Sequence, residues 1–201
     1  MKPFVVYTME LWVPEQTIGD YGKSAIKQAN ELLRQANKPV LVDLLNMEDL
    51  EWCIAAMRNV PSERQLPWHQ MGYMLREENA FNFCFKLTDK AHRVAGACLC
   101  EYCPADNVLN VEMLQNFRIT PSVLDGNLFR FALYTIVLFL LECRGKGVRI
   151  MFPVNRKVAS YYIEKFDFYD ITDDNTGDIL YRDTSDLIAW FVRDAALVEG
   201  E

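Results

Sequence analysis

The sequence predicts an α/β (α+β) fold: a mixed, mostly antiparallel sheet with one parallel β–α–β crossover, flanked by helices. Two observations carry this prediction. Three strand-like segments follow one another with short turns between them, at 81–87, 94–102 and 108–117. A long apolar segment, 124–144, and another strand, 148–154, come next. A strand–helix–strand unit of this kind joins parallel strands through a right-handed crossover.

Alternating residue types define the three strands as an antiparallel meander. Phe81, Phe83 and Phe85 alternate with polar or small residues, which is the period of a half-buried strand. Turn-forming residues at 88–93 and 104–107 separate the strands. We expect the third strand to pair in parallel with 148–154, and the long helix to cover one face of the sheet.

The N-terminal third predicts a strand at 4–9, an amphipathic helix at 21–36 and a second helix at 48–58. Between the helices, residues 40–45 are apolar and form either a short strand or the approach to the second helix. Residues 68–77 are compatible with a further helix.

Residues 148–168 predict a strand, a sharp turn and a short helix. Val148 and Ile150 alternate with less apolar neighbours, and Pro153 ends the strand. Asn155 is a good helix N-cap residue. An apolar stripe at helical spacing follows it, through Tyr162 to residue 166.

This stretch resembles the C-terminal half of the GNAT acetyltransferase fold, in which a strand leads to N…A…(F/L)Y-E-K-x-G-F. The Asn is one residue out of its usual spacing. The matching positions are Asn155, Ala159, Glu164, Lys165 and Phe168. The resemblance covers 81–182, and it predicts one GNAT-like domain over 1–201, with 185–196 as an added C-terminal helix.

The resemblance implies acetyl-CoA, or another acyl-CoA, as cosubstrate. In the family, the turn before the long helix carries Q/R-x-x-G-x-G/A, and its backbone N–H groups bind the pyrophosphate. Here Gly126 is kept, Val123 and Leu128 replace two motif residues, and Asp125 adds negative charge. The implied coenzyme contacts are the backbone of Gln115 and Phe117 for the pantetheine amides, the N–H groups of Gly126, Asn127 and Leu128 for the pyrophosphate, and Asn155.

The resemblance also implies acyl transfer to an amine acceptor, which needs a base and an acid. Glu112 is the candidate base, because burial in its apolar strand would raise its pKa. The alternative is a carboxylate on the open face of that strand. Tyr162 is the candidate acid, although strict alignment places Ile163 at the family tyrosine, with Tyr161 also adjacent. These departures leave a second interpretation open: a catalytically inactive GNAT-like binding or structural protein in a larger assembly.

Charge and hydropathy restrict the partners. A net charge of −7 argues against a nucleic-acid surface. Seven aspartates lie within 167–186 and indicate either attraction of a cationic acceptor or simply solvated turns. The most apolar run, 131–141, is too short to span a membrane. With no signal-peptide pattern at the N-terminus, a cytoplasmic protein is expected.

Cysteines and tryptophans complete the candidates. Cys98, Cys100 and Cys103 form C-x-C-x-x-C, a spacing that occurs in zinc sites. An apolar strand surrounds the first two, which favours packing and predicts no metal site. If the protein acts as a binding component, the faces near Trp68 and Trp190 are the first places to expect a protein partner or a homo-oligomer contact.

Overall fold

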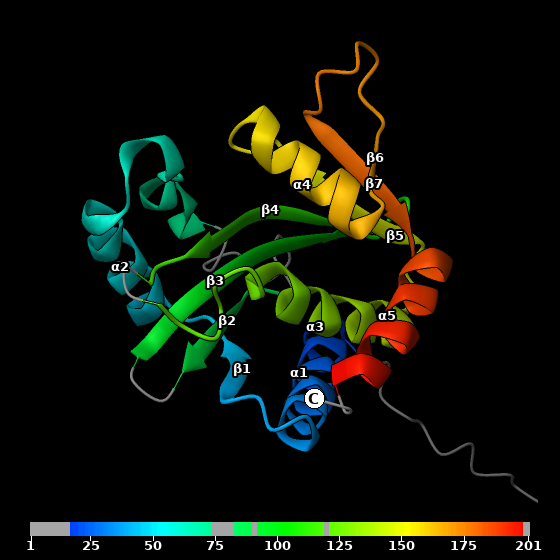
Figure 1. The fold of residues 1–201 in the computed structure, drawn as a ribbon, viewed down its shortest axis with the longest axis horizontal. Coiled ribbons are helices and arrows are strands. Elements are labelled where there is room, and N and C mark those ends of the chain that lie inside the picture. The colour runs from blue at the N-terminus through cyan, green and yellow to red at the C-terminus, as the bar shows by residue number, and fades with distance from the viewer. Residues whose placement is uncertain (1–16, 74–82, 90–91, 119–120, 199–201) are drawn as a thin grey trace, which may run out of the picture.

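The structure, a computed structural model, describes residues 17–73, 83–89, 92–118 and 121–198. Within these residues, seven strands form one sheet in the order β1-β2-β3-β4-β5-β7-β6, with helices packed on both faces (Figure 1). The strands are β1 Val40–Leu44, β2 Phe85–Asp89, β3 His92–Cys103, β4 Val108–Asn116, β5 Gly147–Met151, β6 Tyr169–Asp170 and β7 Ile179–Asp183.

The predicted meander and crossover are both confirmed. β2, β3 and β4 pair antiparallel, with Cys98 opposite Phe85 on one side and Leu114 on the other. β4 and β5 pair parallel, from Val108 opposite Gly147 to Val111 opposite Ile150. The crossover helix between them is α3, Leu128–Cys143.

Helix α3 begins four residues later than the sequence pattern predicts. Residues 123–127 form turns, and Gly126 adopts a positive φ of 72°, which ordinary helical residues avoid. At the other end, Arg144 takes the left-handed conformation and its N–H donates to the Leu140 carbonyl. Most of α3 is buried between these ends, which explains its apolar composition.

The N-terminal elements settle one alternative. Residues 40–44 form strand β1, paired antiparallel with β2. Before it, α1, Ile18–Gln35, starts with a capping box between Thr17 and Asp20. After it comes α2, Met47–Ala56, capped by Asn46. The strand expected at 4–9 lies outside the described residues.

Short 3₁₀ segments follow α2. They are η1 Met57–Asn59, η2 Ser62–Arg64 and η3 Trp68–Tyr73. The helix expected at 68–77 is therefore a 3₁₀ helix as far as residue 73, and its remainder lies outside the described part of the chain.

Two apolar cores flank the sheet. The first lies under α1 and α3, together with α4, Arg156–Phe166, and α5, Thr184–Val198. The second lies under α2 and the 3₁₀ segments. Figure 1 shows α2 well apart from α1, α3 and α5. The sheet is thus covered by four helices on one face and by shorter elements on the other.

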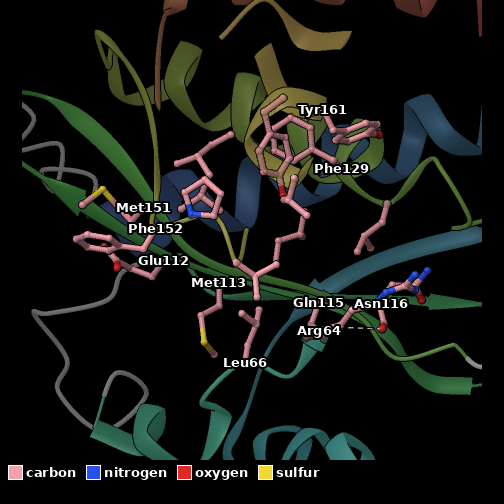
Figure 2. A pocket seen from close by; sticks show the side chains of 18 of the residues that line it. Arg64, Leu66, Glu112, Met113, Gln115, Asn116, Phe129, Met151, Phe152 and Tyr161 are labelled. Atoms are coloured by element: carbon pink, nitrogen blue, oxygen red, sulfur yellow. Dashed lines mark hydrogen bonds between the residues drawn. The ribbon is translucent and has the colours of Figure 1, made fainter. Parts of the chain in front are cut away.

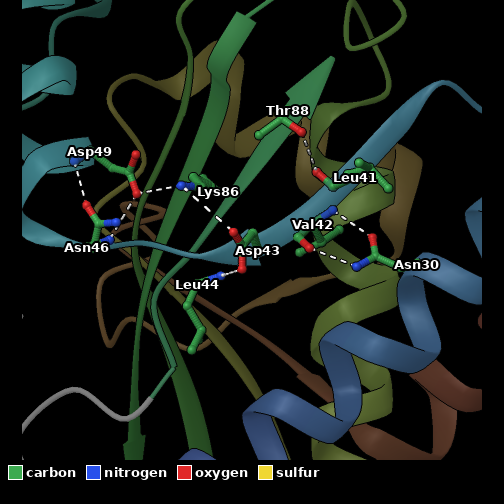
Figure 3. A network of polar contacts seen from close by, with 9 residues as sticks. All are labelled: Asn30, Leu41, Val42, Asp43, Leu44, Asn46, Asp49, Lys86 and Thr88. Carbon is green, nitrogen blue, oxygen red and sulfur yellow. Dashed lines mark hydrogen bonds and ion pairs between the residues drawn. The ribbon is translucent and has the colours of Figure 1, made fainter. Parts of the chain in front are cut away.

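A buried ion pair fastens α2 to the sheet (Figure 3). The Lys86 ammonium on β2 lies 2.6 Å from the Asp49 carboxylate, and both residues are buried. Asp49 also accepts the N–H of Asn46, which completes the capping box of α2. Asp43, opposite Lys86 on β1, lies 4.0 Å from the same ammonium. Because a buried charge without a partner is costly, this arrangement fixes where α2 sits.

Trp68 and Trp190 are packing residues in the structure and are not exposed interface anchors. Trp68 is 0% exposed and its ring packs 5.4 Å from that of Phe117. Trp190 is 8% exposed and packs against Tyr134 and Phe166. Their large apolar rings fill the two cores, so neither presents an aromatic surface to a partner.

Cys98 and Cys100 are fully buried in the first core, as expected for small apolar strand residues. In the described part of the chain, no helix is both long and apolar enough to cross a membrane.

Candidate active-site cleft

A cleft opens where two parallel strands part. The pairing of β4 with β5 ends at Val111 and Ile150, although β4 continues to Asn116. On its other edge, β4 stays paired with β3 as far as Asn116. One edge of β4 therefore faces the cleft with backbone groups that β5 does not pair.

The cleft has a volume of about 310 Å³ and is mainly apolar (Figure 2). Its floor is β4 at 111–116, and one wall is the end of β5 and the following turn, 150–154. Tyr161 and Phe129 lie on one side of it, with Leu66 and Met113 across from them (Figure 2). Helices α3 and α4 and the segment after η2 thus all contribute to its lining.

Glu112 lies on the floor, at an irregularity of the sheet. Leu99 pairs with Met113 while Cys100 pairs with Val111, so Glu112 is an extra residue in a β-bulge. The glutamate is half-buried, and burial raises the pKa of its carboxyl, with a smaller contribution from nearby Glu101. A carboxylate whose pKa is raised toward neutrality is well suited to accept a proton.

The two candidate tyrosines lie next to each other on α4 but are held differently. Tyr162 lines the cleft, and its ring packs 4.6 Å from that of Phe129. Burial raises the pKa of the Tyr162 hydroxyl, which keeps it protonated at neutral pH. Tyr161 also lines the cleft, but its hydroxyl donates to the Gly126 carbonyl over 3.3 Å. Tyr162 therefore carries a hydroxyl proton inside the cleft, whereas Tyr161 fixes the loop before α3.

The loop before α3 leaves space for an anion only in part. A Cβ placed on Gly126 would meet nothing within 4 Å, so the space in front of this residue is open. The N–H groups of Asn127 and Leu128, however, both donate to the Leu124 carbonyl, at 3.0 and 2.9 Å. Two of the three amides expected to bind a pyrophosphate are therefore used within the loop.

Asp125 strengthens this closure of the loop. Its carboxylate accepts the backbone N–H of Ser122 over 2.9 Å and the side-chain amide of Asn116 over 3.2 Å. The charge expected near the phosphates is thus tied to the end of β4. The Asp125 carboxylate stabilises the turn, and it also places a negative charge at this end of the cleft.

The remaining predicted coenzyme residues are dispersed. Gln115 lines the cleft and is nearly buried, and its side-chain carbonyl oxygen has no hydrogen-bond partner. Phe117 packs between Trp52 and Trp68, away from the cleft lining. Asn155 caps α4 by accepting the N–H of Val158 over 3.0 Å. Glu112, Gln115, Gly126, Leu128 and Tyr162 thus line one cleft, whereas Phe117, Asn127 and Asn155 do not.

Sequence reasoning missed two lining residues. Arg64, in η2, lies at the same end of the cleft as Gln115 and Asn116 (Figure 2). Phe152 follows β5 and lies at the opposite end, beside Glu112 (Figure 2). No local pattern marks Arg64, because a long loop brings it to the cleft. A signal for Phe152 did exist, namely an aromatic residue directly before Pro153.

The acidic segment 167–186 does not line the cleft. Asp170 accepts backbone N–H groups of Thr172 and Gly177, and Asp167 pairs with Arg182 at 3.5 Å. These carboxylates stabilise turns and the end of α4.

Comparison with known proteins identifies the fold. The chain matches the ribosomal-protein-S18-alanine N-acetyltransferase of Escherichia coli over 71% of its length and 90% of that chain, with a TM-score of 0.53 and 12% identity. It also matches a spermidine/spermine N-acetyltransferase, SpeG, of Vibrio cholerae, over 76% and 98% of the two chains, with a TM-score of 0.55 and 11% identity.

A third match is the GNAT-family N-acetyltransferase YhbS of Escherichia coli, solved with CoA. It covers 74% of this chain and 84% of the other, with a TM-score of 0.51 and 13% identity. No family sequence model and no curated protein sequence matches the chain. The protein therefore has the fold of the GNAT N-acetyltransferases, recognised through its structure.

Proposed function

We propose that the protein is an acyl-CoA-dependent N-acyltransferase that acts on an amine. The observation that carries the proposal is the opening between β4 and β5, with a half-buried glutamate of raised pKa on its floor. A nearly buried, protonated tyrosine, Tyr162, lines the same cleft. The structures it resembles are acetyltransferases of amines, and one was solved with CoA.

The cleft fits the pantetheine part of an acyl-CoA. An extended chain of amides can add to an exposed strand edge as another strand does. The edge of β4 beyond Val111 is open on the β5 side, and the Gln115 side-chain carbonyl has no partner there. The apolar walls suit the methylene groups of the same arm.

The two titratable groups then have distinct roles. The amine nitrogen forms a bond to the thioester carbonyl carbon, and the carbon–sulfur bond breaks. Glu112 accepts the proton that the amine loses, and the Tyr162 hydroxyl donates one to the departing thiolate. The raised pKa of Glu112 favours acceptance of a proton, and the raised pKa of Tyr162 ensures that its hydroxyl carries a proton to donate.

The nucleotide part of the coenzyme has weaker support. Two loop amides already have acceptors, and Asp125 adds a negative charge. Arg64 lies at this end of the cleft and could supply the cation that a phosphate needs. The closed loop also favours a second candidate function, a GNAT-like protein that binds a partner or ligand without catalysis.

Thermal unfolding of the chain with and without acetyl-CoA tests the proposal. A ligand at 100 times its dissociation constant adds roughly 2.7 kcal/mol of stability. For a chain of this size, that gain should raise the melting temperature by about 5–10 °C. A matched titration with ATP controls for general polyphosphate binding. No shift with acetyl-CoA, or an equal shift with ATP, would contradict the transferase and favour the non-catalytic alternative.

A further inference from the structure

We infer that Phe152 and Glu112 together form the acceptor subsite, and that the acceptor is a monoamine whose amino group is attached to an aromatic or bulky apolar group. The inference rests on the proposed transferase function and deepens it by naming the substrate class. It comes from the end of the cleft opposite Arg64 and Asn116, where Phe152 and Met151 lie beside Glu112 (Figure 2).

Phe152 is held in an unusual backbone conformation. Its φ is 47°, which is rare for a bulky residue, and it directly precedes Pro153, which disfavours helical backbone conformations. Such a conformation costs on the order of 1–3 kcal/mol and persists only where the surroundings enforce it. Here the Phe152 N–H donates to the Asp178 carbonyl over 2.7 Å, so the β7 side holds it in place.

The result of this conformation is an exposed ring at the mouth of an apolar cleft. Phe152 is 66% exposed, in contrast to Trp68 and Trp190, which fill the cores. Residues 151–154 follow one another in the cleft lining, so the exposed ring belongs to a continuous apolar wall and is not an isolated surface residue. An exposed apolar patch of this kind marks a ligand-binding groove. A ligand could bury the exposed face of the Phe152 ring either through offset or edge contact with another ring or through an alkyl group.

The charge around Glu112 restricts the acceptor further. Among the described residues that line the cleft, Glu112 supplies the one carboxylate, and Arg64 adds a positive charge at the other end. A polyamine carries several positive charges and would need several carboxylates. The aspartates of 167–186 are not in this lining. One ammonium next to one apolar group fits the subsite better, and the ring of Phe152 also attracts an ammonium through its face.

The test compares three acceptors with acetyl-CoA on the full chain: 2-phenylethylamine, ethylamine and spermidine. Turnover is followed by release of the free thiol of CoA. We expect kcat/KM for 2-phenylethylamine to exceed that for each of the other two at least tenfold. Phe152→Ala should remove this preference, mainly through a higher KM for 2-phenylethylamine, so that 2-phenylethylamine and ethylamine become equally good acceptors.

Two further variants separate the ring from the backbone and from general surface effects. Phe152→Gly removes the ring and also relieves the strain of the positive φ. It should therefore lose the preference as Phe152→Ala does, but it should unfold at a higher temperature than Phe152→Ala. Ile163→Ala removes an exposed apolar side chain of α4 outside the cleft and should keep the preference.

The outcomes distinguish the two proposals. Equal or better turnover of spermidine or ethylamine would overturn the acceptor assignment and leave the transferase intact. Turnover of none of the three amines, despite a melting shift with acetyl-CoA, would also overturn the acceptor assignment. Absence of that shift would overturn the transferase function, and the acceptor subsite with it.

Discussion

The two ends of the cleft differ in how far the hydrogen bonds of their polar groups are already made within the chain. At the Glu112 end, the carboxylate sits in a bulge with a raised pKa, and an exposed ring lies beside it. At the Gly126 end, the loop amides and Asp125 make their hydrogen bonds within the loop and with β4. At the first end the carboxylate and the ring are available to a ligand, whereas at the second end most polar groups already have hydrogen-bond partners within the chain.

This difference separates two properties that GNAT proteins usually combine. The opening between the parallel strands arises because β5 ends at Met151 while β4 continues past its bulge to Asn116, so it does not depend on the residues of the loop before α3. The anion site depends on particular residues at a turn, and these have changed. Under the proposed transferase function, we therefore expect substitutions at the Glu112 end to affect turnover and substitutions at the Gly126 end to affect coenzyme affinity.

Loss of the base should have the largest effect. Glu112→Gln keeps the shape and removes the proton acceptor, so turnover should fall about 10²–10⁴-fold. The acetyl-CoA dissociation constant, measured by calorimetry, should stay within about twofold, because the base acts on the amine. Glu101→Gln is the matched control and should keep most of the turnover. A Glu112→Gln enzyme within tenfold of the parent would remove Glu112 from the mechanism.

The neighbouring tyrosines should separate chemistry from binding. Tyr162→Phe should lower turnover at least tenfold by removing the hydroxyl that protonates the thiolate. Tyr161→Phe loses the hydrogen bond to Gly126 and should instead weaken acetyl-CoA binding, with kcat little changed. Steady-state kinetics on both variants check this. The reverse pattern would show that Tyr161, and not Tyr162, is the acid.

The loop end is tested at its glycine. Gly126→Val fills the open space and forces a β-branched residue to a positive φ, so acetyl-CoA affinity should fall at least tenfold. Gly177→Val carries a similar backbone penalty at φ 78°, away from the cleft lining, and serves as the matched control. Equal affinity in both valine variants would mean that the coenzyme does not use this loop.

Arg64 should have a smaller effect at the same end. Arg64→Gln removes one exposed cation, and exposed ion pairs contribute roughly 0.2–1 kcal/mol, so the affinity should fall about two- to fivefold. The loss should shrink as salt is added. Arg58→Gln, in η1, is an exposed control of the same charge. Titrations at two salt concentrations that show no difference between Arg64→Gln and this control would exclude a role in anion binding.

The smallest effect concerns stability and pH. Because burial raises the pKa of Glu112, the native state binds this proton more tightly than the unfolded chain does. Stability from this group is present below its ordinary pKa and is lost as pH rises through the raised value. Glu112→Gln should therefore melt at a slightly higher temperature than the parent at neutral pH and lose this advantage in acid. Melting curves of both proteins, recorded from acid to neutral pH, check the sign of this difference in melting temperature.

The sequence predicted the sheet topology well, because topology follows from local patterns. Alternation at 81–87 and the apolar run at 124–144 each report burial over many residues, so small errors in their ends did not matter. The ends themselves were harder to predict. The positive φ of Gly126 delays the start of the predicted helix and that of Phe152 ends the predicted strand early, and such conformations leave little trace in hydropathy.

The cleft was only partly predictable, for a different reason. Two cleft residues could be predicted from periodic patterns. Glu112 interrupts the apolar pattern of its strand, and Tyr162 continues the apolar stripe of its helix. Phe117 was predicted to contact the pantetheine arm through its backbone; in the structure its N–H donates to the Ala95 carbonyl and its ring packs against Trp68, outside the cleft lining. Arg64 and Phe152 reach the cleft through loop geometry, which depends on contacts with distant segments. Sequence alone did not reveal the second core, in which Trp68 packs.

The bulge on β4 changes which residues of the strand face each core: odd-numbered residues face the first core before it, and even-numbered residues do so after it. Before it, Leu109 and Val111 enter the first core, and after it Leu114 packs there while Met113 enters the second. Removing residue 112 would restore simple alternation without turning either half of the strand over, because Leu114 would then follow Val111 by two positions and Met113 by one. Deleting any core residue of β4 outside the bulge would instead shift the alternation and exchange apolar side chains between the two cores. The alternation of β4 therefore does not need residue 112, and the bulge adds to the strand a side chain that packs in neither core.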